Sequence, residues 1–434
     1  MKFIDLFSGL GGFHVAASSL GGECVFASEI NESLRFTYEK NFGLLPSGDI
    51  REVDPVSIPD HDLLCGGFPC QPFSKAGTQA GLQDSMRGTV FFNIIEILKA
   101  KRPKYLILEN VAHFVKHDEG RTYETVCAAL REVGYDINCH TMSPHQFGVP
   151  QIRERMYLVG CLDGLGYFSW PEPYSKKEDL SIRSVLDQNP VSARILPPQV
   201  QSCISAWQQF LDLIPCDLKL PSFPIWSMEF GCTYSYDQPL SELSVKELQK
   251  FTGPFGQSLA GLSRASIMEA LPNYADTNGK DFPVWKKAFI RQNREFYYSN
   301  KKYLGDWVGL ITSFPPSLQK LEWNCQGEKR DLSRHILQFR ASGLRVKRAS
   351  TSPSLVAMTT TQVPIIPWEN RYMTIRECAR LQSMDDVEYF PASVEESMKA
   401  LGNAVNTHVI SLILNQLIPE EQCAKLKNKE AVSA

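Results

Sequence analysis

The feature that most constrains the fold of this chain is a regular alternation, over residues 1–165, of short apolar runs with amphipathic stretches. The apolar runs have no polar face, which is typical of strands buried on both sides in a parallel sheet covered by helices. This alternation predicts an α/β fold with a doubly wound sheet. We expect strands at residues 2–6, 24–27, 62–65, 105–108 and 156–160, and helices that end at Ala17 and span 32–41, 90–100 and 123–133.

A change in the sequence pattern at Trp170, to Pro-rich and Trp-rich irregular sequence, indicates a second domain. From there to about Thr361 the periodicity is weak, yet six of the seven tryptophans lie in this part, which argues against a disordered linker. Helical spacing then returns behind the expected N-caps Thr374 and Ser393 and again at 409–417. We therefore expect a first domain at 1–165, an irregular second domain at 166–364, C-terminal helices at 365–418 that pack back on the first domain, and a polar tail at 419–434.

The composition speaks against several classes of protein. The 12 cysteines are scattered singly, with no C-x-x-C pair and no cluster with histidine at metal-ligand spacing, so neither a disulfide framework nor a zinc site is expected. The stretch MKFIDLFSGLGG has an aspartate inside its apolar run and lacks the build of a secretory signal, and no apolar window is long enough for a membrane span. We expect a cytoplasmic protein with reduced thiols.

The charge of the chain is unevenly distributed. The formal net charge is −3, but residues 286–348 carry 14 basic and 5 acidic side chains. A localised basic face lets a near-neutral protein hold a polyanion, although a solvated surface of mixed charge explains the same numbers about equally well. The densest run is Arg345-Val346-Lys347-Arg348, and we take Arg345, Lys347 and Arg348 as candidate nucleic-acid contacts.

Glycine and acidic residues cluster where the predicted strands end. The turn FSGLGG at 7–12 follows the first strand, Glu29 ends the second and Glu109 ends the fourth, while Asp49 precedes the third. Glycines allow close approach of a ligand, and an acid about twenty residues later is where a doubly wound fold binds ribose hydroxyls. Because parallel strands end at one edge, we expect these groups to converge. For each acid taken singly, a structural role remains open. Glu29 could be an exposed turn residue, and Glu109 could cap the helix that follows.

The stretch GGFPCQPFSKAG, residues 66–77, places a thiol just after the third strand. Cysteine is usually an inert core residue. Here Pro69 and Pro72 restrict the backbone on both sides of Cys70, and the glycine pair lets main chain approach a ligand. The pattern favours a thiol that is presented for reaction over one that is packed in a core.

Six sequence blocks, in order, resemble those of the DNA cytosine-5 methyltransferases of bacterial restriction-modification systems. The blocks are FIDLFSGLGGF at 3–13, GGFPCQPFS at 66–74, LENV at 108–111, PQIRERMYLVG at 150–160, RECARLQ at 376–382 and GNAVN at 402–406. The resemblance implies a Rossmann-like S-adenosylmethionine-dependent methyltransferase fold. Residues 1–165 would then be the catalytic and cofactor-binding domain, and residues 166–364, in which no block matches, the target-recognition domain that reads DNA.

The resemblance also implies a mechanism without a metal. The Cys70 thiolate would add to C6 of a cytosine flipped out of duplex DNA, and Glu109 would hydrogen-bond the N3 atom and the exocyclic amine. Arg153 and Arg155 would hold the base carbonyl and keep the thiol ionised, with ordinary surface ion pairing as the alternative for this pair. DNA contacts are further implied for Gln71 and Ser74.

S-adenosylmethionine is the methyl donor that the resemblance implies. The residues implied to bind it are Phe7, Gly9, Leu10, Gly11, Glu29, Ile30, Asp49, Ile50, Pro69, Asn403 and Ala404. Asp49 would meet the adenine amino group, and Phe7 would pack on the adenine ring. We expect a monomer that acts on double-stranded DNA and protects it from a cognate restriction endonuclease.

Three other functions remain open. A transfer-RNA cytosine-5 methyltransferase would share the chemistry, but its Cys-Phe-Thr segment has only the partial counterpart Gly231-Cys232-Thr233. A catalytically inactive DNA-binding regulator would not need the intact set of reactive residues. A thiol redox protein would need a resolving cysteine near Cys70, and Cys65 in the apolar strand is poorly placed for that role.

Overall fold

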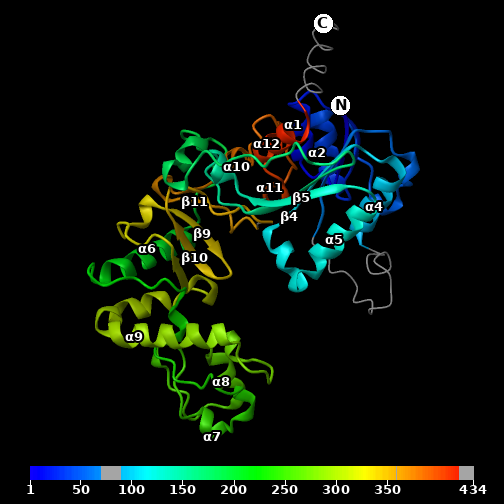
Figure 1. Cartoon of the computed structure of the whole chain (residues 1–434). Coiled ribbons are helices and arrows are strands. Elements are labelled where there is room, and N and C mark those ends of the chain that lie inside the picture. Colours follow the sequence, from blue (N-terminus) through cyan, green and yellow to red (C-terminus); the bar gives the residue numbers. More distant parts are fainter. Residues whose placement is uncertain (70–88, 358, 420–434) are drawn as a thin grey trace. The chain divides into compact units, whose positions relative to one another are not determined.

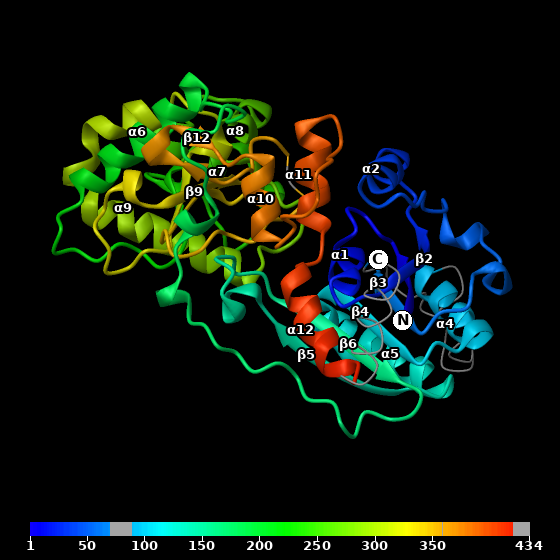
Figure 2. The same ribbon diagram turned by 90° about the horizontal axis from the view of Figure 1, so that it is seen from above.

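The computed structural model describes residues 1–69, 89–357 and 359–419, and the chain divides into two compact units (Figure 1; Figure 2 gives a second view). Unit 1 comprises residues 1–188, 350–360 and 374–434, and unit 2 comprises residues 189–349 and 361–373. The boundary that we expected at residue 165 lies within unit 1. Each unit is therefore assembled from segments that are distant in the sequence.

Unit 1 is built on a six-stranded sheet. Its strands are β1 (Lys2–Leu6), β2 (Glu23–Ser28), β3 (Leu63–Gly67), β4 (Tyr105–Val111), β5 (Asp136–Met142) and β6 (Arg155–Cys161), in the order β2-β1-β3-β4-β6-β5. β1 to β4 are parallel, whereas β6 runs antiparallel to both β4 and β5. The α/β fold is confirmed, but the expectation of a wholly parallel sheet is wrong at this edge.

β5 is the strand that the sequence pattern did not predict. Its residues, DINCHTM, include few long apolar side chains, and all but Met142 are exposed or half-buried. Among the described strands, β5 forms the edge of the sheet and pairs only with β6. The chain turns back after β5 and inserts β6 between β5 and β4, which reverses the direction of β6.

The strands are buried on both faces of the sheet, as their continuous apolar runs predicted. Successive residues alternate between two cores: Ile4 and Leu64 belong to one, and Phe3 and Leu63 to the other. The first core includes α4 (Val90–Lys101) and α5 (Arg121–Glu132), and the second includes α1 (Gly12–Ser18) and α12 (Thr407–Leu417). The sheet therefore has helices on both faces.

The predicted N-caps of the C-terminal helices are confirmed. At the start of α10 (Ile375–Leu381), Glu377 N donates to Thr374 Oγ1 (3.1 Å) and Thr374 N donates to the Glu377 carboxylate (2.8 Å), which forms a capping box. Ser393 accepts from Glu396 N (3.1 Å) at the start of α11 (Val394–Asn403). These helices, like α2 (Glu32–Phe42), belong to unit 1.

Unit 2 contains more regular structure than its sequence pattern predicted. Its core includes the rings of Trp207, Phe210 and Trp307, whose centroids lie 4.9, 5.2 and 5.4 Å apart. The helices are α6 (Pro198–Leu213), α7 (Val245–Leu248), α8 (Arg264–Ala270) and the 28-residue α9 (Val284–Ile311). The sheet has the order β12-β11-β9-β10-β8-β7, with β7 (Ile225–Trp226), β8 (Lys320–Trp323), β9 (Ile336–Arg340), β10 (Gly343–Lys347), β11 (Ile365–Ile366) and β12 (Arg371–Tyr372).

Three further findings concern the described residues as a set. Within residues 1–69, 89–357 and 359–419, no helix is both long and apolar enough to cross a bilayer. The same residues contain no group of three or more His, Cys, Asp or Glu side chains that could hold a metal ion. The ten cysteines among them are all free thiols.

A buried ion pair anchors α9 within unit 2. The Glu229 carboxylate has no exposed surface; it accepts from Arg294 Nε (2.9 Å) and from the Tyr274 hydroxyl (2.7 Å). The Tyr234 hydroxyl also donates to Glu229, and the Arg294 guanidinium lies 4.3 Å from the centroid of the Tyr234 ring. Burial raises the pKa of Glu229, and Arg294 acts against this shift. The carboxylate therefore depends on its cation.

Arg294→Met should lower the free energy of unfolding of unit 2 by about 3–5 kcal/mol, because it leaves a buried carboxylate without its cation. Six of the seven tryptophans belong to unit 2, so tryptophan fluorescence during urea unfolding reports mainly on this unit. Arg348→Met is the matched control, since Arg348 pairs with Glu328 and both side chains are 47% exposed. We expect the control to lose less than about 1 kcal/mol; equal losses would contradict the role given to burial.

Candidate active site

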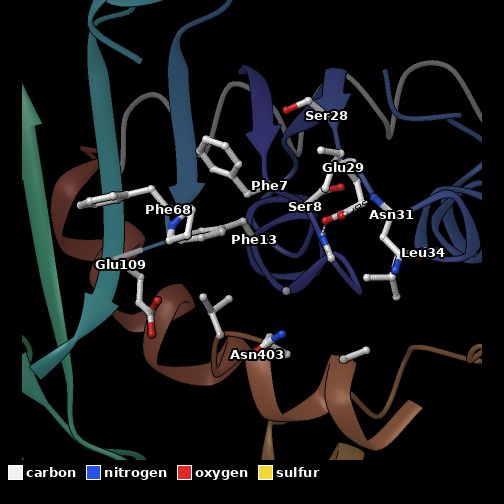
Figure 3. A pocket seen from close by; sticks show the side chains of 18 of the residues that line it. Phe7, Ser8, Phe13, Ser28, Glu29, Asn31, Leu34, Phe68, Glu109 and Asn403 are labelled. Atoms are coloured by element: carbon white, nitrogen blue, oxygen red, sulfur yellow. Dashed lines mark hydrogen bonds between the residues drawn. The ribbon is translucent and has the colours of Figure 1, made fainter. Parts of the chain in front are cut away.

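A pocket of about 660 Å³ lies at the carboxyl ends of β1 to β4, the edge at which the sequence predicted convergence. A volume of this size suits a small-molecule ligand. Figure 3 shows Glu29 on one side of the pocket and Glu109 on the other, with Phe7 and Phe13 between them. The predicted residues that line it are Phe7, Gly9, Glu29, Ile30, Asp49, Ile50, Pro69, Glu109, Arg153, Arg155, Asn403 and Ala404.

The turn after β1 has a backbone shape that few residues adopt. Phe7, Gly9 and Gly11 have positive φ values of 56°, 53° and 81°. At Gly11 a side chain is also excluded by space, because a Cβ atom there would lie 2.3 Å from the Phe42 ring. Ser8 N donates to the Ser28 carbonyl (2.9 Å), which joins the turn to the end of β2. The left-handed conformation at Phe7 is a local strain of the kind found at functional turns.

Glu29 holds this turn through both carboxylate oxygens. Oε2 accepts from Gly9 N (3.0 Å), and Oε1 accepts from Asn31 N (2.8 Å). Ser8 and Ser28 are nearby lining residues, and their hydroxyls are buried and have no hydrogen-bond partner in the described structure. A carboxylate with remaining lone pairs beside two unpaired hydroxyls fits a ligand with hydroxyl and amino groups, such as a nucleoside cofactor. Glu29 is thus more than an exposed turn residue.

Asp49 lines the same side of the pocket and is fixed by its neighbour. Arg51 Nε lies 2.9 Å from Asp49 Oδ1 and 2.8 Å from Oδ2, and Arg51 N donates to Oδ1 (3.0 Å). Hydrogen bonds from Arg51 lower the pKa of Asp49, so this group is a carboxylate acceptor. Ile30 is 69% exposed and adds apolar surface to the pocket.

Glu109 and Arg155 form an ion pair on neighbouring strands. Arg155 Nε lies 3.0 Å from Glu109 Oε1, but its N–H is not directed at that atom, and Oε1 is a buried acceptor without a hydrogen bond. Burial raises the pKa of Glu109, and Arg155 and Arg153 act in the opposite direction. The 3-10 helix that follows, Ala112–Gly120, has no side-chain cap, so Glu109 does not cap it. The carboxyl group can therefore bind a ligand.

Arg153 is buried and holds the GNAVN segment. Its Nη2 donates to the carbonyls of Gly402 (3.0 Å) and Ala404 (2.9 Å), and its Nη1 donates to the carbonyl of Leu355. Burial, followed by the nearby Arg155, lowers the pKa of Arg153 to about 9. Only Nε has no partner in the described structure. These bonds place Asn403 on the pocket wall, and the base contact that the resemblance implies for Arg153 stays a prediction.

Asn110 fixes the segment that leads to the predicted nucleophile. Asn110 Nδ2 donates to the carbonyl of Phe68 (3.1 Å). The Phe68 ring packs against Phe91 and Phe114, with centroids 5.5 and 5.4 Å away. The end of β3 is thus held by one polar and two aromatic contacts.

Cys70 lies outside the described residues, as do Gln71 and Ser74. Their predicted roles stay predictions. Two neighbours in the sequence are placed: Gly67 pairs in register with Glu109, and Pro69 lines the pocket. The described segment that ends at Pro69, the residue before Cys70, therefore lies next to Glu109.

Comparison with known proteins identifies the family. Residues 1–209 and 260–419 match the family model described as C-5 cytosine-specific DNA methylase. The chain belongs to this family. The Type II methyltransferase M.HaeII of Haemophilus aegyptius is 39% identical over 58% of this chain and 79% of its own length. M.AluI of Cellulosimicrobium cellulans is 29% identical over 97% of this chain and 92% of its own length, whereas for M.NgoBI of Neisseria gonorrhoeae (48% identical) the match spans 56% of that protein.

The pocket of this methylase differs from the sequence prediction in a few residues. Leu10 and Gly11 were expected to line it, but Leu10 is buried with 1% exposure, and Gly11 packs against Phe42. Leu10 lies between two residues with positive φ, Gly9 and Gly11, and its side chain is part of the buried interior instead of the pocket lining. The lining residues that sequence reasoning missed include Ser8, Phe13, Ser28 and Phe68. These residues could have been predicted to line the pocket, because each lies close in the sequence to a residue that was predicted to do so.

The basic residues expected to contact DNA lie on and after β10 of unit 2. Arg345 Nε donates to Glu322 (2.7 Å), and Arg348 Nε donates to Glu328 (3.0 Å). Lys347 lies between them and is half-buried. The charges of both arginines are therefore compensated by acids of the same unit, and a DNA contact of this run stays a prediction.

Proposed function

We propose that this methylase transfers the methyl group of S-adenosylmethionine to C5 of a flipped-out cytosine in a specific sequence of duplex DNA. The observation that carries the proposal is a single pocket with two chemically different sides. The Glu29 side fits a nucleoside cofactor, and the Glu109 side offers a buried carboxyl group with an open acceptor atom beside Arg155. Cys70 follows Gly67, the partner of Glu109, by three residues, which can span at most about 11 Å.

Each residue on the Glu109 side has a defined task in this proposal. The Cys70 thiolate forms a bond to C6 of the cytosine, which gives C5 the electron density that it otherwise lacks. Glu109 Oε1 accepts from the exocyclic amine, and its raised pKa favours a proton shared with N3, where negative charge develops. The cation of Arg155 lowers the pKa of the thiol. Loss of the C5 proton then lets Cys70 leave and restores the ring.

The cofactor side would hold S-adenosylmethionine, which would supply the methyl group that C5 accepts. Phe7, Glu29, Asp49 and Asn403 would bind it, and Arg153 positions Asn403 through the carbonyls on either side. Because C5 is inaccessible in a stacked duplex, the cytosine must leave the helix, which costs a few kcal/mol. The enzyme would act as a monomer and protect host DNA from a cognate restriction endonuclease, and its likeness to Type II methyltransferases supports this role.

Tritium transfer from labelled S-adenosylmethionine tests this function when duplex DNA and transfer RNA are offered side by side. We expect label in DNA alone. Label in transfer RNA would favour an RNA methyltransferase, and DNA binding without label in either would favour an inactive regulator. Bisulfite sequencing of DNA from expressing cells then identifies the site, and an endonuclease that cuts at that site should no longer cut this DNA.

Glu29→Ala should weaken S-adenosylmethionine binding by about 10- to 100-fold, because hydrogen bonds to a charged group contribute about 1.5–3 kcal/mol each. Isothermal titration calorimetry of the cofactor with the whole chain measures this change. Glu32→Ala is the matched control: it removes the same charge three residues away, at an exposed position outside the pocket lining. Unchanged affinity in Glu29→Ala would separate this carboxylate from cofactor binding.

A further inference from the structure

Unit 2 has a surface whose positive charges are not neutralised by acids of the described chain. α9 contains six basic and two acidic residues, the acids being Glu295 and Asp306. Arg294 is the cation buried against Glu229. Within the described residues, no ion pair is formed by the other five, which are Lys286, Lys287, Arg291, Lys301 and Lys302. Of the basic region, α9 thus carries five cations without an ion pair, whereas Arg345 and Arg348 are paired with acids.

α9 is labelled in Figure 1, and its sequence spacing places four of these cations on one side of the helix, Lys286 being the exception. Arg291, Tyr298 and Lys302 are spaced by seven and four residues, which places them along a single stripe, and Lys301 lies beside it; all four are exposed. Lys287, four residues before Arg291, extends the stripe and is half-buried, and Glu295 is the one acid between Arg291 and Tyr298 on this side. Tyr298 is 86% exposed, more than any other described aromatic side chain. At 1.5 Å per residue, the stripe from Lys287 to Lys302 is about 22 Å long. It has the length to meet several successive phosphates of a nucleic-acid strand.

The opposite side of α9 is already covered. Ile290, Leu304 and Trp307 are buried in the core of unit 2. An amphipathic helix that binds a membrane needs a broad free apolar face. The large apolar side chains that α9 exposes are Val284 and Trp285 in its first turn and Tyr298 fourteen residues after Val284, which do not form such a face. Charge complementarity therefore favours a polyanion over a lipid surface.

We infer that the stripe formed by Lys287, Arg291, Tyr298, Lys301 and Lys302 binds the sugar-phosphate backbone of duplex DNA without reading its sequence. This inference rests on the proposed function, because it assigns a further contact to the same DNA substrate. Such contacts hold a duplex by releasing condensed counterions, so their contribution is visible in the dependence of affinity on salt. They leave the reading of bases to other parts of the chain.

The test is the salt dependence of binding of the whole chain to a fluorescent 30-base-pair duplex. The variant is Arg291→Gln/Lys301→Gln/Lys302→Gln. Each phosphate contact contributes about 0.9 to the slope of log K against log salt, so the slope should become about 2.7 less steep. Between 50 and 200 mM salt, this variant should lose about 40-fold less affinity than the wild type.

The matched control is Lys219→Gln/Lys246→Gln/Lys250→Gln, which removes three exposed lysines of unit 2 outside α9. An unchanged slope in the α9 variant, or an equal change in the control, would overturn the inference. The inference would also be overturned if the α9 variant changed the salt slope for binding to double-stranded RNA but not for binding to duplex DNA. The proposed function is judged separately, by methyl transfer of the wild-type chain to DNA: label in DNA with an unaltered α9 slope refutes only the α9 contact.

Discussion

A Cys70→Ser chain is expected to bind duplex DNA and to transfer methyl groups at the background rate. A hydroxyl is far less ionised than a thiol at neutral pH, so it cannot add to C6 as the thiolate does. Losing a catalytic nucleophile costs a rate factor on the order of 10⁶ in a well-studied hydrolase, and we expect a comparable loss here. The measurement is tritium incorporation into duplex DNA at saturating cofactor. Incorporation at the wild-type rate would remove Cys70 from the mechanism.

Two further measurements make this result specific. Cys216→Ser is the matched control, because Cys216 is an exposed free thiol of unit 2, and this variant should keep full activity. A duplex with 5-fluorocytosine at the target site should form a covalent adduct with the wild-type chain, since fluorine cannot leave C5 as the proton does. The adduct should resist denaturing electrophoresis and be missing with Cys70→Ser.

Glu109→Gln should lower the rate of methyl transfer by about 10²- to 10⁴-fold, the usual contribution of a positioned general acid or base. Glutamine keeps the shape of the side chain and a hydrogen-bond acceptor for the exocyclic amine, but it cannot give a proton to N3. Single-turnover rates measure this step without product release. Glu154→Gln is the matched control, because Glu154 is an exposed carboxylate directly between the pocket-lining residues Arg153 and Arg155 and does not itself line the pocket.

The pH dependence of the same step gives an independent check. Burial raises the pKa of Glu109, so the folded chain keeps this proton to a higher pH than a free carboxyl group does. The wild-type rate should therefore gain a component that falls as pH rises through this raised pKa, on top of the opposite trend from thiol ionisation. The residual rate of Glu109→Gln should lack the falling component. The same falling limb in both proteins would assign it to another group.

The parts of the fold that the sequence predicted are those with a strong local pattern. β1 to β4 are runs of apolar residues because both faces of each strand are buried. Each strand can therefore be predicted from its own residues, without knowledge of its neighbours in the sheet. The caps at Thr374 and Ser393 are equally local, because each side chain binds an amide three residues ahead. β5 escaped prediction because an edge strand is largely exposed and needs few apolar residues.

The candidate site also has features that the local sequence predicted and contacts that it could not predict. The convergence of Glu29 and Glu109 followed from their positions at the ends of strands, because parallel strands share one edge. The bonds that use the guanidinium of Arg153 could not be predicted, since its partners Leu355 and Gly402 are about 200 or more residues away in the sequence. The pairing of Arg345 with Glu322 is hidden for the same reason.

The sequence by itself determined which chemistry this chain carries: a presented thiol, two acids at strand ends and a glycine-rich turn, in an order that one enzyme family shares. Those features are short-range, because turn geometry and strand burial depend on neighbouring residues. Only the tertiary structure decided which charges are free to act. In the folded chain, Arg345 and Arg348 are paired with acids, and Arg153 and Arg294 are enclosed with their partners, whereas Arg291, Lys301 and Lys302 of α9 are exposed. Charge compensation depends on distance in space, and the chain order alone does not contain that distance.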